Sequence, residues 1–563
     1  MEPEEPPVNR LVNRRIRLLL AALTLAFGVL LLRATWLQGV RAESLSRLGQ
    51  TQHREAVTVP AGRGTIYDRS GVELALGERA TTIYANPMQV TNPRRAAVAA
   101  ERALGLDADR LYPILADHSR GFVYVARQAD PAQAAALQRM KLPGFGFYPE
   151  ERRSYPQRSV GAQVLGYVGI DGQGLAGLEL EFDRDLAGRA GTETVVKDPS
   201  GRVISVESQR AEVPGRGIYV TLDHSIQANA EEVLRQTVGK WHAKSASAIV
   251  LDPRTGSILA MAVQPGYDAN RFPSVARDLQ RNRTVTDTYE PGSTFKLITV
   301  AGALSEGIVA PSTRFTLPYS LHVADRVIHD AEKRGTVNYS VAQILAHSSN
   351  IGAITLAELL GRTRLSSWIS RFGFGRTTGV DFPGESPGIV LPPDKWSGST
   401  IGNVPIGQGI AVTPVQMAAA YAAIANRGTW SRPHLVDHVE GGGRPSLYRR
   451  RLVSPRIARE LMTMLEDVVA EGTGQYAAIP GYKVAGKTGT AQKPDSHGGY
   501  ATGRYVASFV GIVPASRPRF VVLVTVDEPR GAIWGGLVAA PAFQQIARFD
   551  LQYLEVPPDG PSG

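Results

Sequence analysis

The sequence contains no cysteine among its 563 residues. This absence excludes disulfide bonds, thiolate nucleophiles and cysteine-ligated metal sites. A covalent nucleophile in this chain must therefore be a serine, threonine, lysine or carboxylate side chain. Lysine is also scarce, since only ten of the 62 basic residues are lysine and the others are arginine. The sequence has no dense basic cluster with interleaved aromatic residues, so we expect no nucleic-acid partner.

Long apolar runs are also rare, and only the N-terminal region has one that could cross a membrane. Residues 18–32 carry no charge, and Arg10, Arg14, Arg15 and Arg17 precede them. If Arg33 snorkels toward the interface beside Trp36, the apolar segment extends to residue 40, which gives the ~20 residues that a span requires. We therefore predict a cytoplasmic tail at 1–17 and a single-pass membrane anchor at 18–40, with the body of the protein outside the cytoplasm.

A cleaved signal peptide is the alternative interpretation of this segment, because Val40-Arg41-Ala42 faintly resembles a cleavage site. The length of the apolar stretch and the arginine before the cut favour a retained anchor.

The rest of the chain divides into two regions. Residues 41–215 mix short strands, helical patterns and many glycines without a catalytic constellation, so we predict a non-catalytic pedestal of mixed α and β structure. Residues 216–553 contain two pairs of apolar strands, at 246–251 with 257–263 and at 506–513 with 520–526, and mainly helical patterns between them. This pattern predicts an α/β fold in which helices cover an antiparallel sheet on both faces. We expect residues 554–563 to be a disordered tail.

The first candidate nucleophile is Ser293, in the run Pro291-Gly292-Ser293-Thr294-Phe295-Lys296. Proline and glycine interrupt the chain before a helical run, so Ser293 is expected at a helix N-terminus, where N–H groups favour negative charge. Lys296 is three residues further on and shares a helix face with Ser293. A lysine kept neutral by burial or a nearby cation can take the proton of a serine hydroxyl. Taken alone, an ordinary helix start is the simpler interpretation, because this spacing occurs by chance about once in such a chain.

Two further runs complete the pattern. Ser348-Ser349-Asn350 is the only Ser-x-Asn in the chain, and Lys487-Thr488-Gly489-Thr490 follows an apolar lead-in. In isolation, a turn between helices and an exposed edge-strand lysine are the simpler interpretations. The order Ser-x-x-Lys, Ser-x-Asn, Lys-Thr-Gly carries the argument, with separations of 348 − 293 = 55 and 487 − 350 = 137 residues.

This combination resembles the penicillin-recognising serine enzymes. The runs at 63–71 and 174–188 are similar to the pedestal of class B penicillin-binding proteins. The stretch 286–290, just before the nucleophile, resembles the division-type (FtsI-like) branch, and 406–416 fits the same family. The resemblance extends from the anchor to about residue 550.

The resemblance implies roles for the residues of the first two runs. Ser293 would attack the carbonyl between the terminal D-alanines of a peptidoglycan stem peptide, and Lys296 would accept its proton. Ser348 would relay a proton to the leaving D-alanine, and Asn350 would bind the donor peptide and orient Lys296.

The third run would bind the substrate. Lys487, Thr488 and Thr490 would hold its carboxylate, and Lys487 would also keep Lys296 neutral. Gly489 suits a strand edge that a substrate backbone approaches closely. The N–H groups of Ser293 and Thr490 would form an oxyanion hole. No metal or other cofactor is implied, because the offsets between His322, His329 and His347 match no common ligand spacing.

The implied partners are stem peptides on lipid II-derived glycan strands, β-lactams as inhibitors, a SEDS-family glycan polymerase and other divisome membrane proteins. Four alternatives remain open at this stage: an elongation-type transpeptidase, a D,D-carboxypeptidase, a serine β-lactamase or β-lactam sensor, and a non-catalytic divisome scaffold.

Overall fold

The computed structural model describes residues 7–40, 54–197, 203–444, 446–495 and 498–560. The chain forms two compact units. Unit 1 consists of Met1–Ala61 and Arg189–Pro214, and unit 2 consists of Gly62–Gly188 and Gly215–Gly563. Most of the predicted pedestal therefore belongs to the same unit as the C-terminal region.

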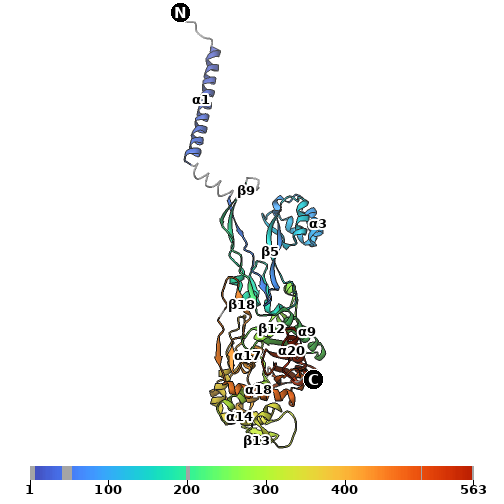
Figure 1. Cartoon of the computed structure of the whole chain (residues 1–563). Coiled ribbons are helices and arrows are strands. Elements are labelled where there is room, and N and C mark those ends of the chain that lie inside the picture. The colour runs from blue at the N-terminus through green and yellow to red at the C-terminus, as the bar shows by residue number, and fades with distance from the viewer. Residues whose placement is uncertain (1–6, 41–53, 198–202, 445, 496–497, 561–563) are drawn as a thin grey trace. The chain divides into compact units, whose positions relative to one another are not determined.

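Unit 1 contains the N-terminal helix α1 (Pro7–Thr35), which the π-helical turn η1 (Trp36–Val40) continues. The stretch Val12–Gly39 is long and apolar enough to cross a membrane, and an 18-residue window within it has a mean hydropathy of 2.1 (Figure 1). The helix begins at Pro7, before the expected start of the span at residue 18, because proline is tolerated in a first turn and arginine favours helix. The predicted tail at 1–17 is therefore largely helical from Pro7 onward.

A three-stranded antiparallel sheet of order β1-β8-β9 completes unit 1. Its strands are β1 (Arg54–Val59), β8 (Gly191–Lys197) and β9 (Val203–Arg210).

The N-terminal part of unit 2 is built on a sheet of order β18-β10-β2-β3-β4, with β5 also paired to β3. Its strands are β2 (Ile66–Tyr67), β3 (Glu73–Ala85), β4 (Val123–Ala129), β5 (Phe145–Ser154), β10 (Ile218–Val220) and β18 (Val436–Val439). Strand β10 pairs with β2 on one side and with β18 on the other. This shared sheet explains why residues 62–188 do not separate from the C-terminal region. Helices α3 (Pro93–Leu104), α4 (Ala108–Leu115) and α5 (Pro131–Arg139) pack against β3 and β4 in their own small core.

The two glycine-containing runs of the pedestal meet through a buried ion-pair network. Arg63 Nε lies 2.7 Å from Glu179 Oε2, and Arg63 Nη1 lies 2.7 Å from Asp183 Oδ1. Arg153 Nε lies 2.6 Å from the other oxygen of Glu179, whose side chain is fully buried. A buried carboxylate requires such partners, so this network fixes how the two runs pack.

The C-terminal part of unit 2 is built on a five-stranded antiparallel sheet of order β12-β11-β22-β21-β20. Its strands are β11 (Ser245–Leu251), β12 (Ile258–Gln264), β20 (Ala485–Pro494), β21 (Tyr500–Val513) and β22 (Phe520–Asp527). The pairing of β11 with β22 joins segments far apart in sequence, with Ser245 opposite Asp527. The predicted fold class is confirmed, and β20, which carries Lys487–Thr490, is one of the two edge strands of this sheet.

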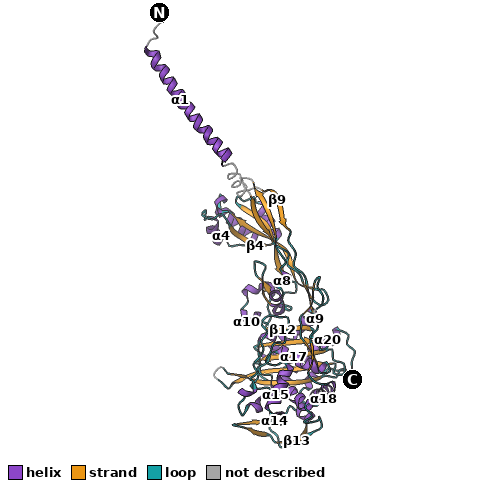
Figure 2. Cartoon of the chain, turned by 90° about the vertical axis from the view of Figure 1, so that its left-hand side faces the viewer, coloured by secondary structure: helices purple, strands orange, loops and turns teal. Residues whose placement is uncertain are grey.

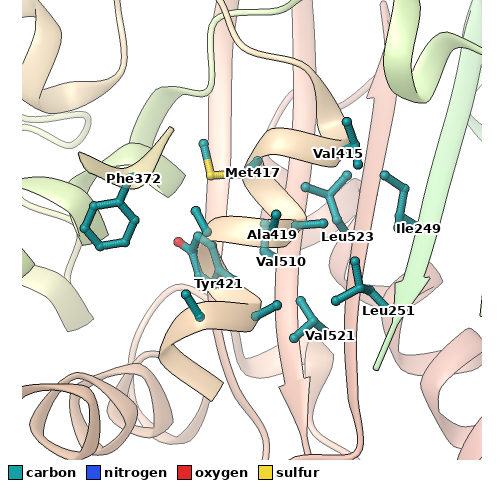
Figure 3. Packing of buried hydrophobic residues seen from close by; sticks show 14 of the residues in the cluster. Ile249, Leu251, Phe372, Val415, Met417, Ala419, Tyr421, Val510, Val521 and Leu523 are labelled. Carbon is teal, nitrogen blue, oxygen red and sulfur yellow. The ribbon is translucent and has the colours of Figure 1, made fainter. Parts of the chain in front are cut away.

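Helices cover both faces of this sheet, because its strands alternate apolar side chains between two cores. On β22, Val522 and Val524 face the core shared with α9 (His224–Trp241) and α20 (Ala540–Tyr553). Val521 and Leu523 face the other core, where α17 (Pro414–Ala425) packs with Met417 and Tyr421 against the sheet (Figure 3). Figure 2 shows the strands of this sheet between helices.

The remaining elements are mostly short connections around these layers. Those of the pedestal are η2 (Pro87–Gln89), α6 (Ala162–Leu165), β6 (Tyr167–Val168), β7 (Gly174–Ala176), α7 (Gly177–Glu181) and α8 (Asp183–Leu186). Those that precede α17 are η3 (Ala269–Ser274), α10 (Arg277–Gln280), α11 (Arg283–Thr286), η4 (Gly292–Phe295), α12 (Lys296–Ser305), β13 (Arg314–Leu317), β14 (Ser320–Val323), β15 (Arg326–His329), β16 (Val337–Ser340), α13 (Val341–Ala346), α14 (Asn350–Leu360), α15 (Arg362–Phe372), η5 (Pro393–Lys395), α16 (Thr400–Asn403) and η6 (Val404–Ile406). Those that follow it are β17 (Thr429–Ser431), β19 (Arg449–Arg451), α18 (Pro455–Ala470), η7 (Gln475–Ala477) and α19 (Gly535–Val538).

The C-terminal tail differs from the expectation of disorder from residue 554. Val556 is largely buried, and its carbonyl oxygen accepts a hydrogen bond of 2.6 Å from the Tyr482 hydroxyl. Asp559 accepts hydrogen bonds from the N–H groups of Lys483 and Ser516. These contacts hold the tail to the fold as far as residue 560, and residues 561–563 lie outside the described part.

Candidate active site

Ser293 lies in the 3-10 turn η4, directly before helix α12. The turn is tight at Gly292, where φ is +54° and an added Cβ would lie 2.8 Å from the Thr490 carbonyl oxygen. Thr294 anchors the turn, because its hydroxyl donates to the Pro291 carbonyl and its own carbonyl accepts from the Tyr421 hydroxyl, both at 2.8 Å. Ser293 is therefore held rigidly at the start of a buried helix, and its own side chain is half-buried.

Lys296 is fully buried one turn further on. Its Nζ donates to Asn350 Oδ1 at 2.7 Å, to the Ser348 carbonyl oxygen, and to Ser348 Oγ at 3.3 Å. Burial lowers the pKa of Lys296 to about 7, although the negative charge of Asp330 acts in the opposite direction. A large fraction of this lysine is therefore neutral near physiological pH, which is the form that can accept a proton.

Ser348 lies in the short turn between helices α13 and α14, as expected for a connection between helices. Its φ of +59° places it in the left-handed region, which costs free energy for a residue with a side chain. The Ser348 hydroxyl lies between two amines, 3.3 Å from Lys296 Nζ and 2.9 Å from Lys487 Nζ. The strained turn thus places one hydroxyl where it can exchange protons with both lysines.

Lys487 lies on the edge strand β20 but is fully buried, so the simpler interpretation of an exposed edge lysine is wrong. Its Nζ also contacts Thr488 Oγ1 at 3.3 Å. Burial, and then the positive charge of Lys296, hold the pKa of Lys487 well below its usual range. For Lys296, burial is the principal cause of the lowered pKa, whereas the resemblance had implied that Lys487 plays this part.

The rest of the third run lies against the nucleophile turn. At Gly489 an added Cβ would lie 2.8 Å from the Pro291 carbonyl oxygen, so only glycine allows this approach. The Thr490 hydroxyl accepts a hydrogen bond of 3.0 Å from the Gly535 N–H. The Thr488 hydroxyl lies 2.7 Å from that of Thr473.

A cleft of about 960 Å³ opens over this cluster. Its lining includes Ser293, Ser348, Asn350, Thr488 and Thr490, whereas the buried Lys296 and Lys487 lie beneath it. In the part of the chain that the structure describes, the Ser293 hydroxyl makes no hydrogen bond. The structure therefore brings all three runs together around one cleft, with a hydroxyl at its surface and two amines below.

The cleft also contains residues that sequence reasoning missed, among them Asp330, Thr473, Tyr476 and Trp534. Asp330 is 6% exposed and contacts the Ser348–Asn350 turn directly. None of these residues belongs to a recognisable run, and none carries a sequence signal that could have identified it.

Two groups of residues could be considered for metal binding. His329 and His347 line the cleft, but their rings stack on Tyr319 and Tyr339. Elsewhere, ligand atoms of Asp68, Asp223 and His224 lie within 4.8 Å of one another.

The Asp68 oxygens of that second group are already used. Oδ1 accepts from the N–H groups of Ser70 and Val72, and Oδ2 lies 2.7 Å from His224 Nδ1. Asp223 caps helix α9 through the N–H groups of its first turn. We therefore interpret this group as packing and capping contacts.

Comparisons with known proteins agree with this geometry. The family model described as "Penicillin binding protein transpeptidase domain" matches residues 246–548, and "Penicillin-binding Protein dimerisation domain" matches residues 58–220. Peptidoglycan D,D-transpeptidase FtsI of Escherichia coli K12 is 34% identical over 97% of this chain and 93% of its own length. Penicillin-binding protein PbpB of Mycolicibacterium smegmatis is 35% identical over 92% of this chain and 86% of its own length.

The fold is also similar to those of solved structures. Penicillin-binding protein 3 of Mycobacterium tuberculosis in complex with aztreonam matches with a TM-score of 0.71 and 30% identity, covering 90% of this chain and 99% of that one. A peptidoglycan synthetase from Bifidobacterium adolescentis matches with a TM-score of 0.73 and 28% identity, covering 91% and 98%.

Proposed function

We propose that this chain, which belongs to the penicillin-binding proteins with a transpeptidase domain, is a peptidoglycan D,D-transpeptidase that forms an acyl-enzyme on Ser293. The observation that carries the proposal is the Ser348 hydroxyl between the amines of Lys296 and Lys487, with Ser293 one helical turn before Lys296. A buried amine with a pKa of about 7 can act as a base at neutral pH and needs no metal to do so.

The first half-reaction is acylation. Ser293 Oγ attacks the carbonyl carbon between the two terminal D-alanines of a stem peptide, and neutral Lys296 takes the hydroxyl proton. The peptide C–N bond then breaks, and the leaving D-alanine amine receives a proton through Ser348. Asn350 accepts from Lys296 and so holds the base in place.

Strand β20 supplies the binding groups. Lys487 and the hydroxyls of Thr488 and Thr490 hold the substrate carboxylate, and Gly489 lets the peptide backbone lie against the strand. The N–H groups of Ser293 and Thr490 stabilise the oxyanion, each contributing ~3 kcal/mol.

In the second half-reaction, an amine of a neighbouring stem peptide attacks the Ser293 ester. The C–O bond breaks, Ser293 regains its proton, and the new amide is the cross-link. β-Lactams acylate Ser293 because they resemble the D-Ala-D-Ala end.

A septal role fits the similarity to FtsI of Escherichia coli and the run at 286–290, and we propose it over an elongation role. The similarity also includes a stage V sporulation protein D of Bacillus subtilis at 33% identity, so a depletion experiment must decide. Filamentation on depletion supports a division role, whereas rounding of the cells supports elongation.

We further propose that α1 anchors the chain in the cytoplasmic membrane, with the arginine-rich N-terminal side inside and the active site outside. A SEDS-family glycan polymerase and other divisome membrane proteins are the proposed partners. Arg33 within the apolar segment permits a polar helix–helix contact. Cross-linking from positions along Val12–Gly39 in the living cell tests this partner.

The decisive experiment is mass spectrometry after incubation with a β-lactam. We expect an adduct on the peptide that contains Ser293, its loss in Ser293→Ala, and its retention in Ser305→Ala at the other end of the same helix. Rapid release of the adduct indicates a β-lactamase. A protein that never forms the adduct but still binds its partners is a scaffold.

A further inference from the structure

The Ser348–Asn350 turn receives its main support from the carboxylate of Asp330, a residue that belongs to none of the three runs. Asp330, just beyond strand β15, is 6% exposed. Its Oδ1 accepts from the backbone N–H groups of Asn350 at 2.5 Å and Ile351 at 3.1 Å. Both oxygens also accept from the Ser349 hydroxyl, at 3.2 and 3.1 Å. Asp330 therefore caps the N-terminus of helix α14, where a negative charge is favourable.

The residue before Asp330 fixes the Asn350 side chain. The carbonyl oxygen of His329 accepts from Asn350 Nδ2 at 3.0 Å, while Asn350 Oδ1 accepts from Lys296 Nζ at 2.7 Å. Because its amide nitrogen has a partner on the His329 side, the oxygen of Asn350 must face the lysine. The segment His329–Asp330 thus holds both the backbone and the amide of Asn350.

Asp330 is itself held by Arg334. The guanidinium donates to Asp330 Oδ2 through Nε at 2.9 Å and through Nη2. It also donates to the carbonyl oxygens of Leu317 at 3.0 Å and Pro318 at 3.2 Å, and it lies 5.8 Å from the centre of the Tyr339 ring. These contacts tie the carboxylate to strands β13 and β16, so its position does not depend on the turn that it holds.

We propose that Asp330, which is itself held by Arg334, is a positioning residue for acylation. Its hydrogen bonds fix the Ser348–Asn350 turn next to Lys296, and its negative charge acts on this lysine. The inference rests on the proposed function, because it concerns the base of that reaction. Asp330 acts through Asn350 and through its charge, and the structure shows no contact between Asp330 and the Ser293 side chain among the described residues.

The charges around Lys296 determine in which direction each substitution should shift the pKa of this lysine. Among the described residues, Asp330 is the charged group that acts on the pKa of Lys296. Lys487 on β20 shares the Ser348 hydroxyl with Lys296, and Arg334 faces Asp330. Ser348 and Asn350 carry no charge. Asp330 raises the pKa of Lys296 against the effect of burial. Loss of this charge must therefore lower the pKa of Lys296, and loss of Arg334 must raise it.

The test is the second-order rate of acylation of the detergent-solubilised full-length chain by a fluorescent penicillin, measured from pH 5 to 9. For Asp330→Asn we expect the plateau of the acylation rate at high pH to be at least tenfold lower than in the wild type. We also expect the rise of the rate on the acid side of the profile to shift by about one pH unit toward lower pH. For Arg334→Gln we expect a displacement toward higher pH. Asp325→Asn is the matched control, since it removes one exposed carboxylate from the hairpin of β14 and β15, and it should leave the profile unchanged.

A merely structural role predicts a different result. Asp330→Asn would then lose activity only in proportion to its unfolded fraction, and the acid limb would stay in place in both variants, which overturns the inference. If Ser293 of the wild type is labelled normally but the pH profiles of Asp330→Asn and Arg334→Gln do not shift, the proposed function stands and the role of Asp330 is refuted. Absence of labelling in the wild type refutes both.

Discussion

The close approach of strand β20 to the nucleophile turn can be tested by adding one methyl group. In Gly489→Ala the new Cβ would lie 2.8 Å from the Pro291 carbonyl oxygen and 3.0 Å from Thr294 Cγ2. It would also lie 2.3 Å from Ser508 Oγ, but that hydroxyl can rotate away. The clash with the Pro291 backbone must be relieved by movement of the turn itself.

The magnitude follows from these distances. Ordinary van der Waals contact begins at 3.4 Å, so the turn and the strand must separate by 3.4 − 2.8 = 0.6 Å. A misplacement of ~1 Å in an active site costs ~100-fold in rate, so we expect acylation to fall about 10- to 100-fold. Overpacking of this kind costs ~1–3 kcal/mol of stability, which leaves the protein folded at room temperature.

Gly486→Ala is the matched control, because it lies on the same strand and faces a similar clash. Its Cβ would lie 2.8 Å from the Val510 carbonyl oxygen and 2.5 Å from Phe509 Cζ, with no contact to the nucleophile turn. We expect a comparable loss of melting temperature but an acylation rate per folded molecule close to that of the wild type. If Gly489→Ala acylates as fast as Gly486→Ala, the contact between β20 and the turn does not position Ser293.

Three further predictions concern protonation and buried charge. The acylation rate should rise with pH and level off above about pH 7, where Lys296 loses its proton; a rise that continues to pH 10 would contradict a lowered pKa. Burial raises the pKa of Glu231 to about 7, so the neutral form is favoured in the folded state and stability falls as pH rises from about 4.5 through 7. We therefore expect the free energy of unfolding of Glu231→Gln, relative to that of the wild type, to be up to ~3 kcal/mol higher at pH 8 than at pH 5 in denaturation experiments. The same relative stability at both pH values would refute this. Arg63→Ala should cost ~3–5 kcal/mol by leaving buried Glu179 short of a partner, whereas Arg94→Ala, which removes an exposed ion pair, should leave the melting temperature nearly unchanged in the same thermal unfolding assay.

The sequence predicted the parts of this fold that depend on local patterns. The two strand pairs, now β11 with β12 and β21 with β22, follow from short apolar runs, and the helices between them follow from the spacing of apolar residues. It did not predict the ordered tail, because the contacts of Val556 and Asp559 are with distant segments. Nor did it predict that β2, β10 and β18 share one sheet, since two of these strands have only two or three residues.

The candidate site shows the same limit. Ser293, Ser348 and Lys487 could be found because each stands in a short run whose order is informative. Asp330 could not be found, since a single aspartate after a strand carries no pattern, and its contacts appear only when the chain folds back on the Ser348 turn. The burial of Lys487 was also unpredictable, because edge strands usually present lysine to solvent.

The two buried lysines explain why packed helices and a network of hydrogen bonds surround the short turn at Ser348. Each ammonium group loses its hydration on burial, and the two repel each other, so folding favours states in which at most one of them is charged. Such an arrangement is stable only if the surrounding layers hold it, and Ser348 is held at a positive φ by helices α13 and α14 on either side. The conformational strain and the desolvated amines thus occur at the same place, where the Ser348 hydroxyl contacts both lysines. A structure that only needed stability would replace these lysines with apolar residues, so their retention argues that the neutral amine is there for chemistry.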